Sequence, residues 1–307
     1  MSLFDWLVVR GMPLVPKPIV RRVASRYVAG ETLDDALRTV ERLAAEGAMA
    51  TLDVLGEEVR DRAKALATVE EYERMLAAIA ERGLPANISV KPTALGLEVD
   101  EAFCRDNLER LVEAARAQQS FVRIDMEDVS ATDATLRIHA DLHARHANVG
   151  VVLQAYLRRT LADIDALPRG GANVRLCKGI YLEPRASAYK EFETIRLNFL
   201  LALEKLLVRG AYVGVATHDE HLVCGALGLL DKLHVPRERY ELQMLLGVEP
   251  ELRRILIAAG HRLRVYVPYG RDWYPYSTRR LRENPQVAKH VLRAMVARRA
   301  RAAEGIG

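Results

Sequence analysis

The sequence predicts an α/β protein folded as a (β/α)₈ TIM-like barrel, and three observations lead to that class. Short segments rich in Val, Ile and Leu alternate with longer segments of helical periodicity, which favours a parallel sheet covered by helices. About eight such strand–helix units can be counted, the number that closes a barrel, and 307 residues suit this fold. An open doubly wound sheet is the alternative, but the chain lacks its G-x-G-x-x-G fingerprint and any Walker loop.

Composition and charge describe an ordinary globular protein. Half of the residues are hydrophobic, 28% are charged, and the formal net charge is +4 with acidic and basic residues interspersed. This argues against nucleic-acid binding, which usually needs a basic stripe. Three scattered cysteines, Cys104, Cys177 and Cys224, form neither a disulfide framework nor a metal knuckle, and they indicate a reducing compartment such as the cytoplasm. No apolar run is long enough to span a bilayer.

Residues 1–30 are expected to form an N-terminal helical arm, and residues 31–307 the barrel domain. The first twenty residues carry a charge within the apolar stretch and several prolines after it, so they make a poor signal peptide. The excess of arginine near both ends, for example Arg21 and Arg22, would suit a solvated helix face or an acidic membrane surface.

The elements follow in order from caps and periodicity. Thr32 can cap the first clear helix, which Gly47 ends. Helices are expected at residues 32–46, 59–82, 100–118, 132–146, around 161, 186–209, 220–233, 250–259, and from about Ser277. Strands are expected within residues 49–58, 86–96, 121–128, 149–156, 173–181, 211–219, 240–247 and 261–270. The strands are expected to be apolar on both faces, as in a sheet covered by helices.

Polar residues gather at the carboxyl ends of the predicted strands, where barrel enzymes hold their active sites. In chain order they are Asp53, Glu57, Lys91, Arg123, Asp125, Glu127, Asp128, Gln154, Tyr156, Arg175, Lys178, Tyr181, Thr217, His218, Asp219, Gln243 and Tyr266. Any one of them could simply cap the next helix, and a capping or packing role is favoured for His218 alone. The whole ring predicts a charged functional mouth.

The stretch after the last strand, residues 265–284, is dense in arginine and tyrosine, which predicts an anion-binding lid. Arg279 and Arg280 are helix neighbours and point about 100° apart, so both cannot face one small ligand squarely. Glu283 lies one turn further on. One arginine is therefore expected on a ligand carboxylate and the other in an ion pair, with Tyr266 and Tyr276 as flat walls.

Several of these segments resemble the signatures of the proline dehydrogenase family. RLCKGIY (175–181) is similar to its R-L-V-K-G-A-Y motif, and residues 266–284 to its Y-x-P-x-G … Y-x-x-R-R-x-x-E-N motif. LDVLGE, SVKPTALG, RIDMED, VLQAY and ATHD match its strand ends in order, so the resemblance spans roughly residues 31–284. The chain looks like the short, single-activity bacterial form.

The resemblance implies a distorted (βα)₈ barrel that holds FAD non-covalently. It implies oxidation of L-proline to Δ1-pyrroline-5-carboxylate, with hydride passing from C5 of proline to flavin N5, as the first step of proline catabolism. It further implies that electrons pass to a membrane quinone, with peripheral contact at the inner face of the membrane.

The resemblance also assigns residues position by position. The proline carboxylate is received by Lys91, Arg279 and Arg280, and Asp125 orients these cations. Glu283 braces the arginines, Glu57 pairs with Arg279, and the pyrrolidine ring packs against Tyr266, Leu245 and Tyr276. The FAD contacts implied are Met126, Gln154, Arg175, Lys178, Gly179, Ile180, Thr217 and His218, with Arg175 at the flavin N5 edge. Asp125 and Arg175 are thus the expected catalytic residues. Ile180 and Cys177 depart from the family's alanine and valine.

Other functions remain open at this point. A Schiff-base aldolase barrel would use Lys178 or Lys91 with a lowered pKa as its nucleophile. A barrel that only binds an amino acid would need no catalytic group. A metal hydrolase is the weakest alternative, because the chain has no paired histidines at ligand spacing and no metal is expected.

Overall fold

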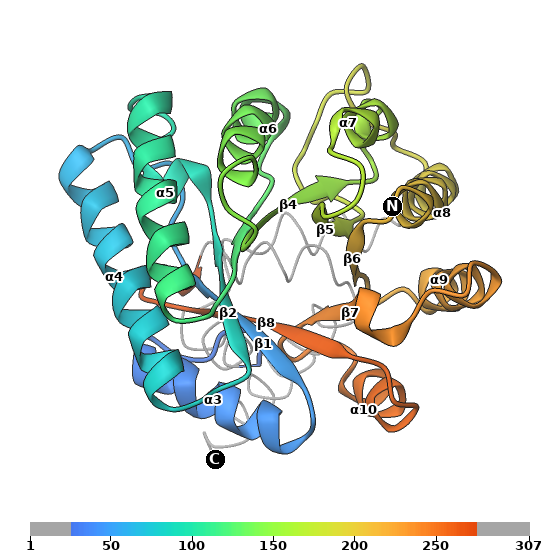
Figure 1. Cartoon of the computed structure of the whole chain (residues 1–307), viewed down its shortest axis with the longest axis horizontal. Helices are drawn as coiled ribbons and strands as arrows, with labels where there is room; N and C mark the ends of the chain where they lie inside the picture. Colours follow the sequence, from blue (N-terminus) through green and yellow to red (C-terminus); the bar gives the residue numbers. More distant parts are fainter. Residues whose placement is uncertain (1–25, 275–307) are drawn as a thin grey trace, which may run out of the picture.

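The computed structural model describes residues 26–274, and these form a closed barrel of eight parallel strands in the order β1 to β8 (Figure 1). The predicted fold class is therefore confirmed. The strands are β1 (Met49–Val54), β2 (Ala86–Val90), β3 (Val122–Ile124), β4 (Val149–Gln154), β5 (Asn173–Cys177), β6 (Tyr212–Ala216), β7 (Tyr240–Leu245) and β8 (Leu263–Tyr269). Pairing of β1 with β8 closes the ring.

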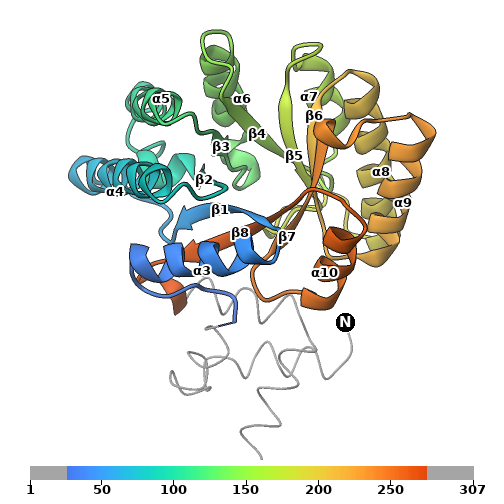
Figure 2. The ribbon, with the colours of Figure 1, turned by 60° about the horizontal axis from the view of Figure 1, so that its bottom comes forward.

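Helices surround the barrel (Figures 1 and 2). They are α3 (Leu33–Ala45), α4 (Arg62–Glu81), α5 (Glu101–Ala117), α6 (Val129–His143), α7 (Thr160–Ala166), α8 (Phe192–Val208), α9 (Glu220–Lys232) and α10 (Pro250–Ala258), with short 3₁₀ turns η2 (Pro92–Leu95) and η3 (Arg237–Arg239). Local chemistry sets their starts. Thr32 and Asp35 form a capping box at α3, while Asp128 and Asp219 cap α6 and α9.

Helix α8 begins at Phe192, six residues later than the predicted start at 186. The intervening segment bonds to the loop after β4 instead. The Arg158 amide donates to the Ser187 carbonyl at 3.0 Å, and the Tyr189 amide to the Tyr156 carbonyl at 2.8 Å. Helical periodicity was correct for the helix but could not show that its first turn is used for this pairing.

The inner faces of several strands are polar, so the expectation that the strands are apolar on both faces is wrong. In β3 and the residue after it, Val122 and Ile124 are buried among apolar side chains, whereas the intervening Arg123 and the following Asp125 contact polar groups. Arg175 of β5 reaches side chains of β2 and β7, which are not its neighbours, so it crosses the barrel interior. Arg175 is thus paired by polar side chains from across the barrel, as buried charged groups usually are.

Arg123 does not lie at the mouth, where its position in the sequence had placed it. Its guanidinium donates to the carbonyls of Val151 at 3.0 Å and Asn173 at 2.7 Å. Asn173 is the first residue of β5, so Arg123 points toward the amino ends of the strands. Burial first, and then the nearby Arg175 charge, lower the pKa of Arg123 to about 9.

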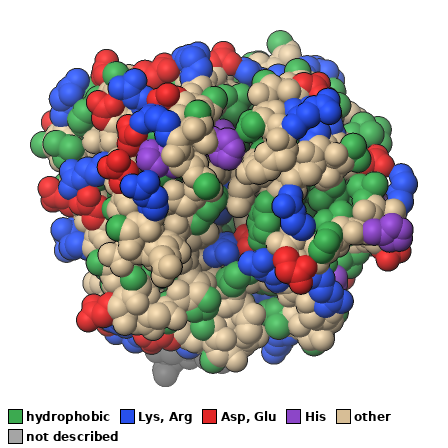
Figure 3. Space-filling model, in the orientation of Figure 1, with side chains coloured by type: hydrophobic (Ala, Val, Ile, Leu, Met, Phe, Trp, Pro, Cys, Tyr) green, Lys and Arg blue, Asp and Glu red, His purple; other side chains and the backbone are tan. Residues whose placement is uncertain are grey.

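The junction between β8 and β1 is covered by α3, which precedes β1 in the chain (Figure 2). In a regular barrel this position belongs to the helix that follows β8. The helix over this seam therefore comes from the chain before β1, which departs from the regular pattern. No helix within residues 26–274 is both long enough and apolar enough to cross a membrane. Basic and acidic side chains are interspersed over the face shown in Figure 3.

Candidate active site

Two acidic and two basic side chains meet inside the carboxyl end of the barrel. They come from β1 (Asp53), the residue after β2 (Lys91), the residue after β3 (Asp125) and β5 (Arg175). Lys91 Nζ lies 2.7 Å from Asp53 Oδ2 and 4.0 Å from Asp125 Oδ2, while Arg175 Nη1 lies 2.8 Å from Asp125 Oδ1. All four residues are buried. The sequence-predicted Lys91, Asp125 and Arg175 are thus brought together.

Tyr266 and Ser89 complete the contacts of Asp125. The Tyr266 hydroxyl donates to Asp125 Oδ2 at 3.0 Å and accepts from Lys91 Nζ at 3.3 Å. The Ser89 hydroxyl donates to Asp125 Oδ1 at 2.7 Å. The Arg175 guanidinium also lies 5.4 Å from the centre of the Tyr266 ring, within the range of a cation–π contact. Asp125 therefore fixes Lys91, Arg175 and Tyr266 relative to one another.

Lys91 remains a cation in this site. Burial by itself would lower its pKa, but the carboxylates of Asp53 and Asp125 outweigh burial and raise the pKa above its ordinary value. Tyr72 of α4 supports the pair from behind, because its hydroxyl lies 3.1 Å from Asp53 Oδ1. A Schiff-base lysine needs a lowered pKa, so this arrangement opposes the aldolase alternative at Lys91.

Within the described part of the chain, the β4 and β5 ends hold an unpartnered polar atom and a position that requires glycine. Gln154 Nε2 donates to the Glu127 carbonyl at 2.7 Å, whereas its buried Oε1 has no partner among residues 26–274. Gly179 has φ +104°, and a Cβ there would lie 2.2 Å from the Tyr156 ring. Only glycine fits this position. Met126 is buried, and Ile180 is half-buried beside Gly179.

The loops after β5 and β6 are joined through Asp219. Its carboxylate lies 3.1 Å from Lys178 Nζ and 2.7 Å from Arg196 Nη2. Burial would raise the pKa of Asp219, but Arg196 and Lys178 lower it to about 2. The Thr217 hydroxyl accepts from the Asp219 amide at 3.1 Å. These contacts hold Lys178 at the β5 end of the mouth.

His218 is bound to the backbone of the next strand, since its Nε2 accepts from the Leu245 amide at 2.7 Å. Leu245 pairs with Tyr266 in the sheet. Glu57 is close enough to raise the pKa of Lys91 along with the two aspartates. Tyr276, Arg279, Arg280 and Glu283 lie outside the described residues.

Sequence reasoning missed the roles of Ser89, Tyr72 and Glu241. Ser89 and Glu241 each lie two residues before a residue singled out at the mouth, Lys91 and Gln243, and so share its inward face. The period of two could have found both. Tyr72 is an apolar-looking member of a helix stripe, and nothing in the sequence shows that its hydroxyl reaches Asp53.

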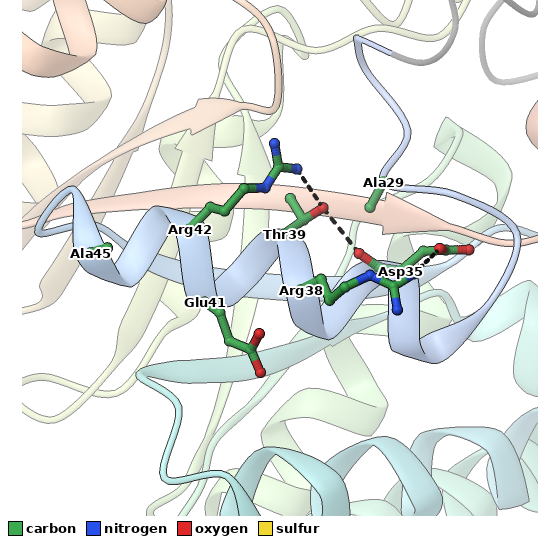
Figure 4. Close-up of a pocket in the computed structure, with 7 residues that line it drawn as sticks. All are labelled: Ala29, Asp35, Arg38, Thr39, Glu41, Arg42 and Ala45. Carbon is green, nitrogen blue, oxygen red and sulfur yellow. Dashed lines mark hydrogen bonds and ion pairs between the residues drawn. The ribbon is translucent and has the colours of Figure 1, made fainter.

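A depression of about 510 Å³ lies elsewhere, along α3, and is lined by Ala29, Asp35, Arg38, Thr39, Glu41, Arg42 and Ala45 (Figure 4). Its charged groups already pair within the helix, for example Arg38 with Asp35, and Arg42 with Thr39 at 3.0 Å. It therefore offers few unpaired polar groups to a ligand, unlike the barrel mouth.

Within the described residues, Glu109, Glu113 and His146 lie close enough to share a metal ion. Arg145 already pairs with Glu109, and His146 Nε2 lies 3.3 Å from the same carboxylate. The cluster lies between α5 and the end of α6, away from the barrel mouth. Existing ion pairs account for it.

Comparisons with known proteins identify the family. The family model described as proline dehydrogenase matches residues 36–293. Proline dehydrogenase 1 of Bacillus subtilis is 37% identical over 273 residues, which cover 89% of this chain and 90% of that protein. Proline dehydrogenase of Deinococcus radiodurans is 34% identical over 281 residues, covering 89% of this chain and 90% of the relative.

Solved structures show the same fold. The structure of proline utilization A from Bdellovibrio bacteriovorus, inactivated by N-propargylglycine, superposes with a TM-score of 0.80 at 24% identity. The match covers 85% of this chain and 32% of that one, so this chain spans about a third of the larger protein.

The aldolase and the non-catalytic alternatives find no support in these matches. Flavin dependence is a property of the matched family. Since the family model covers most of the sequence and two named relatives match along nearly their whole length, this chain belongs to the proline dehydrogenase family and oxidises proline, the first step of proline catabolism.

Proposed function

We propose that this chain binds FAD and L-proline together at the barrel mouth and converts proline to Δ1-pyrroline-5-carboxylate. The observation that carries the proposal is the cluster around Asp125, in which one buried carboxylate holds Arg175, Tyr266 and, at 4.0 Å, Lys91. Fixed cations and an aromatic wall suit a small amino acid, because a preorganised clamp removes the cost of orienting it during reaction.

The proline carboxylate is assigned to Lys91, Arg279 and Arg280. Lys91 can serve because it is cationic and its partner Asp53 is completely buried behind it. Two carboxylates and two cations in the cluster balance one another, so an added anion needs further positive charge, which the arginine pair would supply. Asp125 is the residue that orients the cations.

Tyr266, Leu245 and Tyr276 are assigned to the pyrrolidine ring. Tyr266 and Leu245 are sheet neighbours on β8 and β7, so their side chains line one side of the mouth. Glu283 is assigned to bracing the arginines. Glu57, already close to Lys91, is assigned to pairing with Arg279 over the bound substrate.

The residues at the β4 to β6 ends fit FAD. The unpartnered Gln154 Oε1 would accept from the N–H of the ring system, with Met126 packed beside it and Arg175 at the N5 edge. Lys178, Gly179 and Ile180 are assigned to the ribityl and pyrophosphate region, where the Lys178 cation can pair with phosphate. Thr217 and His218 are assigned to the nucleotide portion.

The chemistry that FAD supplies when bound is acceptance of a hydride at N5. Lys91 and the assigned arginines would orient proline by its carboxylate, and its amine must be neutral when the hydride leaves. Arg175 provides positive charge where negative charge develops. Ile180, in place of alanine, adds bulk at this end of the site.

We further propose that electrons pass to a membrane quinone, and that a cytoplasmic protein makes peripheral contact with the inner face of the membrane. We assign residues 1–30 to an arm that takes part in that contact and residues 31–307 to the barrel domain. The apolar and basic character of the first thirty residues supports this assignment. We expect anionic vesicles to stimulate the reduction of a short-chain quinone by the full chain. We expect that stimulation to be lost when residues 1–25 are deleted.

The absorbance spectrum of the purified protein tests the central proposal. Flavin bands that bleach when L-proline is added under anaerobic conditions are expected, together with proline-dependent reduction of an electron-accepting dye. Arg280→Lys should mainly raise KM for proline, and Arg175→Ala should mainly slow bleaching. A colourless protein, or flavin bands unchanged by proline, would contradict the proposal.

A further inference from the structure

A chain of hydrogen bonds runs from Arg175 down into the barrel interior. Arg175 Nε donates to Gln243 Oε1 at 2.5 Å, and Gln243 Nε2 donates to Glu241 Oε1 at 2.6 Å. Glu241 is held in turn by Arg264 Nε at 2.8 Å and by the Tyr212 hydroxyl at 2.9 Å. Gln243 and Glu241 are both buried. These two side chains lie below the cluster around Asp125 and belong to none of the assigned binding groups.

The order of these contacts fixes the direction of the Gln243 amide. Burial would raise the pKa of Glu241, but Arg264 outweighs it and lowers the pKa to about 2, so Glu241 is a carboxylate that can only accept. Gln243 must therefore turn its NH₂ toward Glu241. Its oxygen is then turned toward Arg175, which can only donate.

Space for Gln243 is provided by Gly214 on β6. A Cβ at this position would lie 2.4 Å from Gln243 Nε2 and 2.9 Å from its Cδ. Gly214 pairs with Glu241 and with Arg175 in the sheet. Its φ is not in the left-handed region, so glycine is required here for close approach and not for an unusual backbone.

The consequence for Arg175 is a defined presentation of its guanidinium. Nε is used by Gln243, and Nη1 by Ser89 at 3.0 Å and Asp125 at 2.8 Å. Among residues 26–274, Nη2 has no hydrogen-bond partner and is the nitrogen left for a ligand. Because a guanidinium is planar and rigid, fixing two nitrogens fixes the direction of the third.

We propose that Glu241, Gln243 and Gly214 form a positioning unit that sets the orientation of Arg175 from below, so that its free nitrogen faces the bound flavin and substrate. None of the three touches the ligand. The inference rests on the proposed function of Arg175, and it adds that the rate of hydride transfer depends on residues in the lower barrel.

Gly214→Ala tests the unit, with Gly228→Ala as the matched control, since a Cβ at Gly228 of α9 meets nothing within 4 Å. Both holoenzymes are mixed with proline in an anaerobic stopped-flow instrument, and the midpoint potential of the bound flavin and Tm are measured. Gly214→Ala is expected to slow flavin reduction at least about tenfold with little change in the Kd of proline. The midpoint potential of the flavin should fall by up to about 30 mV, which corresponds to a tenfold change in the equilibrium constant of a two-electron reduction.

A double-mutant cycle separates positioning from general loss of packing. Gln243→Leu removes the oxygen that accepts from Arg175 Nε and replaces the amide with an apolar side chain of similar size. If Gly214→Ala does not fold, Gln243→Leu alone is compared with the wild type. If Gly214 acts through Gln243, the double variant is no slower than Gln243→Leu, whereas independent packing defects would multiply.

Wild-type flavin reduction rates and potentials in both single variants would overturn the inference, as would multiplicative effects in the double variant. These outcomes differ from failure of the proposed function. In that case the wild-type protein itself would show no proline-dependent bleaching, and no variant would be informative about Arg175.

Discussion

The two faces of the same strands build two different kinds of interior. Between the strands and the helices, side chains such as Val174 and Leu176 pack into one continuous apolar layer that is fully shielded from solvent. Inside the barrel, the alternate residue Arg175 joins a hydrogen-bonded network that extends from Asp125 to Glu241. A barrel interior is more often filled by branched apolar side chains.

This difference separates stability from geometry. The outer layer stabilises the fold through burial, which is not directional, so it tolerates shape-preserving change. The inner network stabilises the fold less, because buried ion pairs roughly repay their desolvation, but each contact has one direction. Substitutions in the outer layer should therefore lower the free energy of unfolding, and substitutions in the inner network should lower turnover.

The largest effect is expected where a titratable group lies in the outer layer. His139 of α6 is fully buried, and burial, His143 and Arg123 lower its pKa from 6.5 to about 3. As pH falls from 6.5 toward 3, the unfolded chain takes up a proton that the folded chain resists, so stability is lost. At about 1.4 kcal/mol per pH unit, this amounts to about 5 kcal/mol. In denaturant unfolding, the free energy of unfolding of His139→Leu should rise relative to that of the wild type as pH falls. A difference between the two that does not depend on pH would contradict this prediction.

An apolar substitution in the same layer should cost nearly as much without affecting catalysis. Phe199 of α8 is completely buried, so Phe199→Ala should lower the free energy of unfolding by about 3–5 kcal/mol. Leu201→Ala on the exposed side of that helix is the control and should cost far less. The kcat/KM of the folded Phe199→Ala enzyme should stay within about twofold of wild type. A large kinetic defect would show that the two interiors are coupled.

In the inner network, Asp125→Asn should have the opposite profile. An amide has only one accepting oxygen and no negative charge, so it cannot both accept from Arg175 and Tyr266 on separate oxygens and balance two cations. The kcat/KM for proline should therefore fall about 100-fold, which corresponds to about 2.7 kcal/mol of transition-state stabilisation. Exposed Asp141→Asn, which loses only a surface pair with Arg145, is the control. Steady-state kinetics and chemical unfolding are measured on the same samples. Reduced stability with unchanged kcat/KM would show a purely structural role and contradict the prediction.

The smallest effect is expected at Tyr72, which belongs to the outer layer yet touches the inner network. Tyr72→Phe removes the hydroxyl near Asp53 and should cost about 1–2 kcal/mol of stability. The KM for proline should rise a few-fold, because Asp53 holds Lys91. Tyr240→Phe, whose hydroxyl lies 2.8 Å from the His261 ring, is the control and should leave KM unchanged. Equal kinetics in both variants would argue that Lys91 needs no support from α4.

The sequence carried enough information to predict the barrel and the meeting of Lys91, Asp125, Arg175 and Tyr266. Strand–helix alternation fixes the parallel sheet, and the carboxyl ends of parallel strands must share one rim. The depth of each inward side chain was not predictable. Arg123 and Asp125 are two residues apart and both point inward. Arg123 nevertheless contacts the amino end of β5, whereas Asp125 contacts Arg175 and Tyr266 at the mouth. Depth depends on strand stagger, which arises only when the sheet closes.

The late start of α8 and the contribution of Tyr72 were hidden for a related reason. Both depend on contacts between segments distant in the chain, such as the pairing of Tyr189 with Tyr156. Local propensity describes what a segment can form, and tertiary contacts decide which residues of it are used.

The placement of α3 has a consequence for the order in which the barrel can be completed. Because α3 packs on both β1 and β8, the two strands that close the ring share one covering helix. That helix precedes both strands in the chain. The element that covers the closing pair is therefore synthesised before either strand.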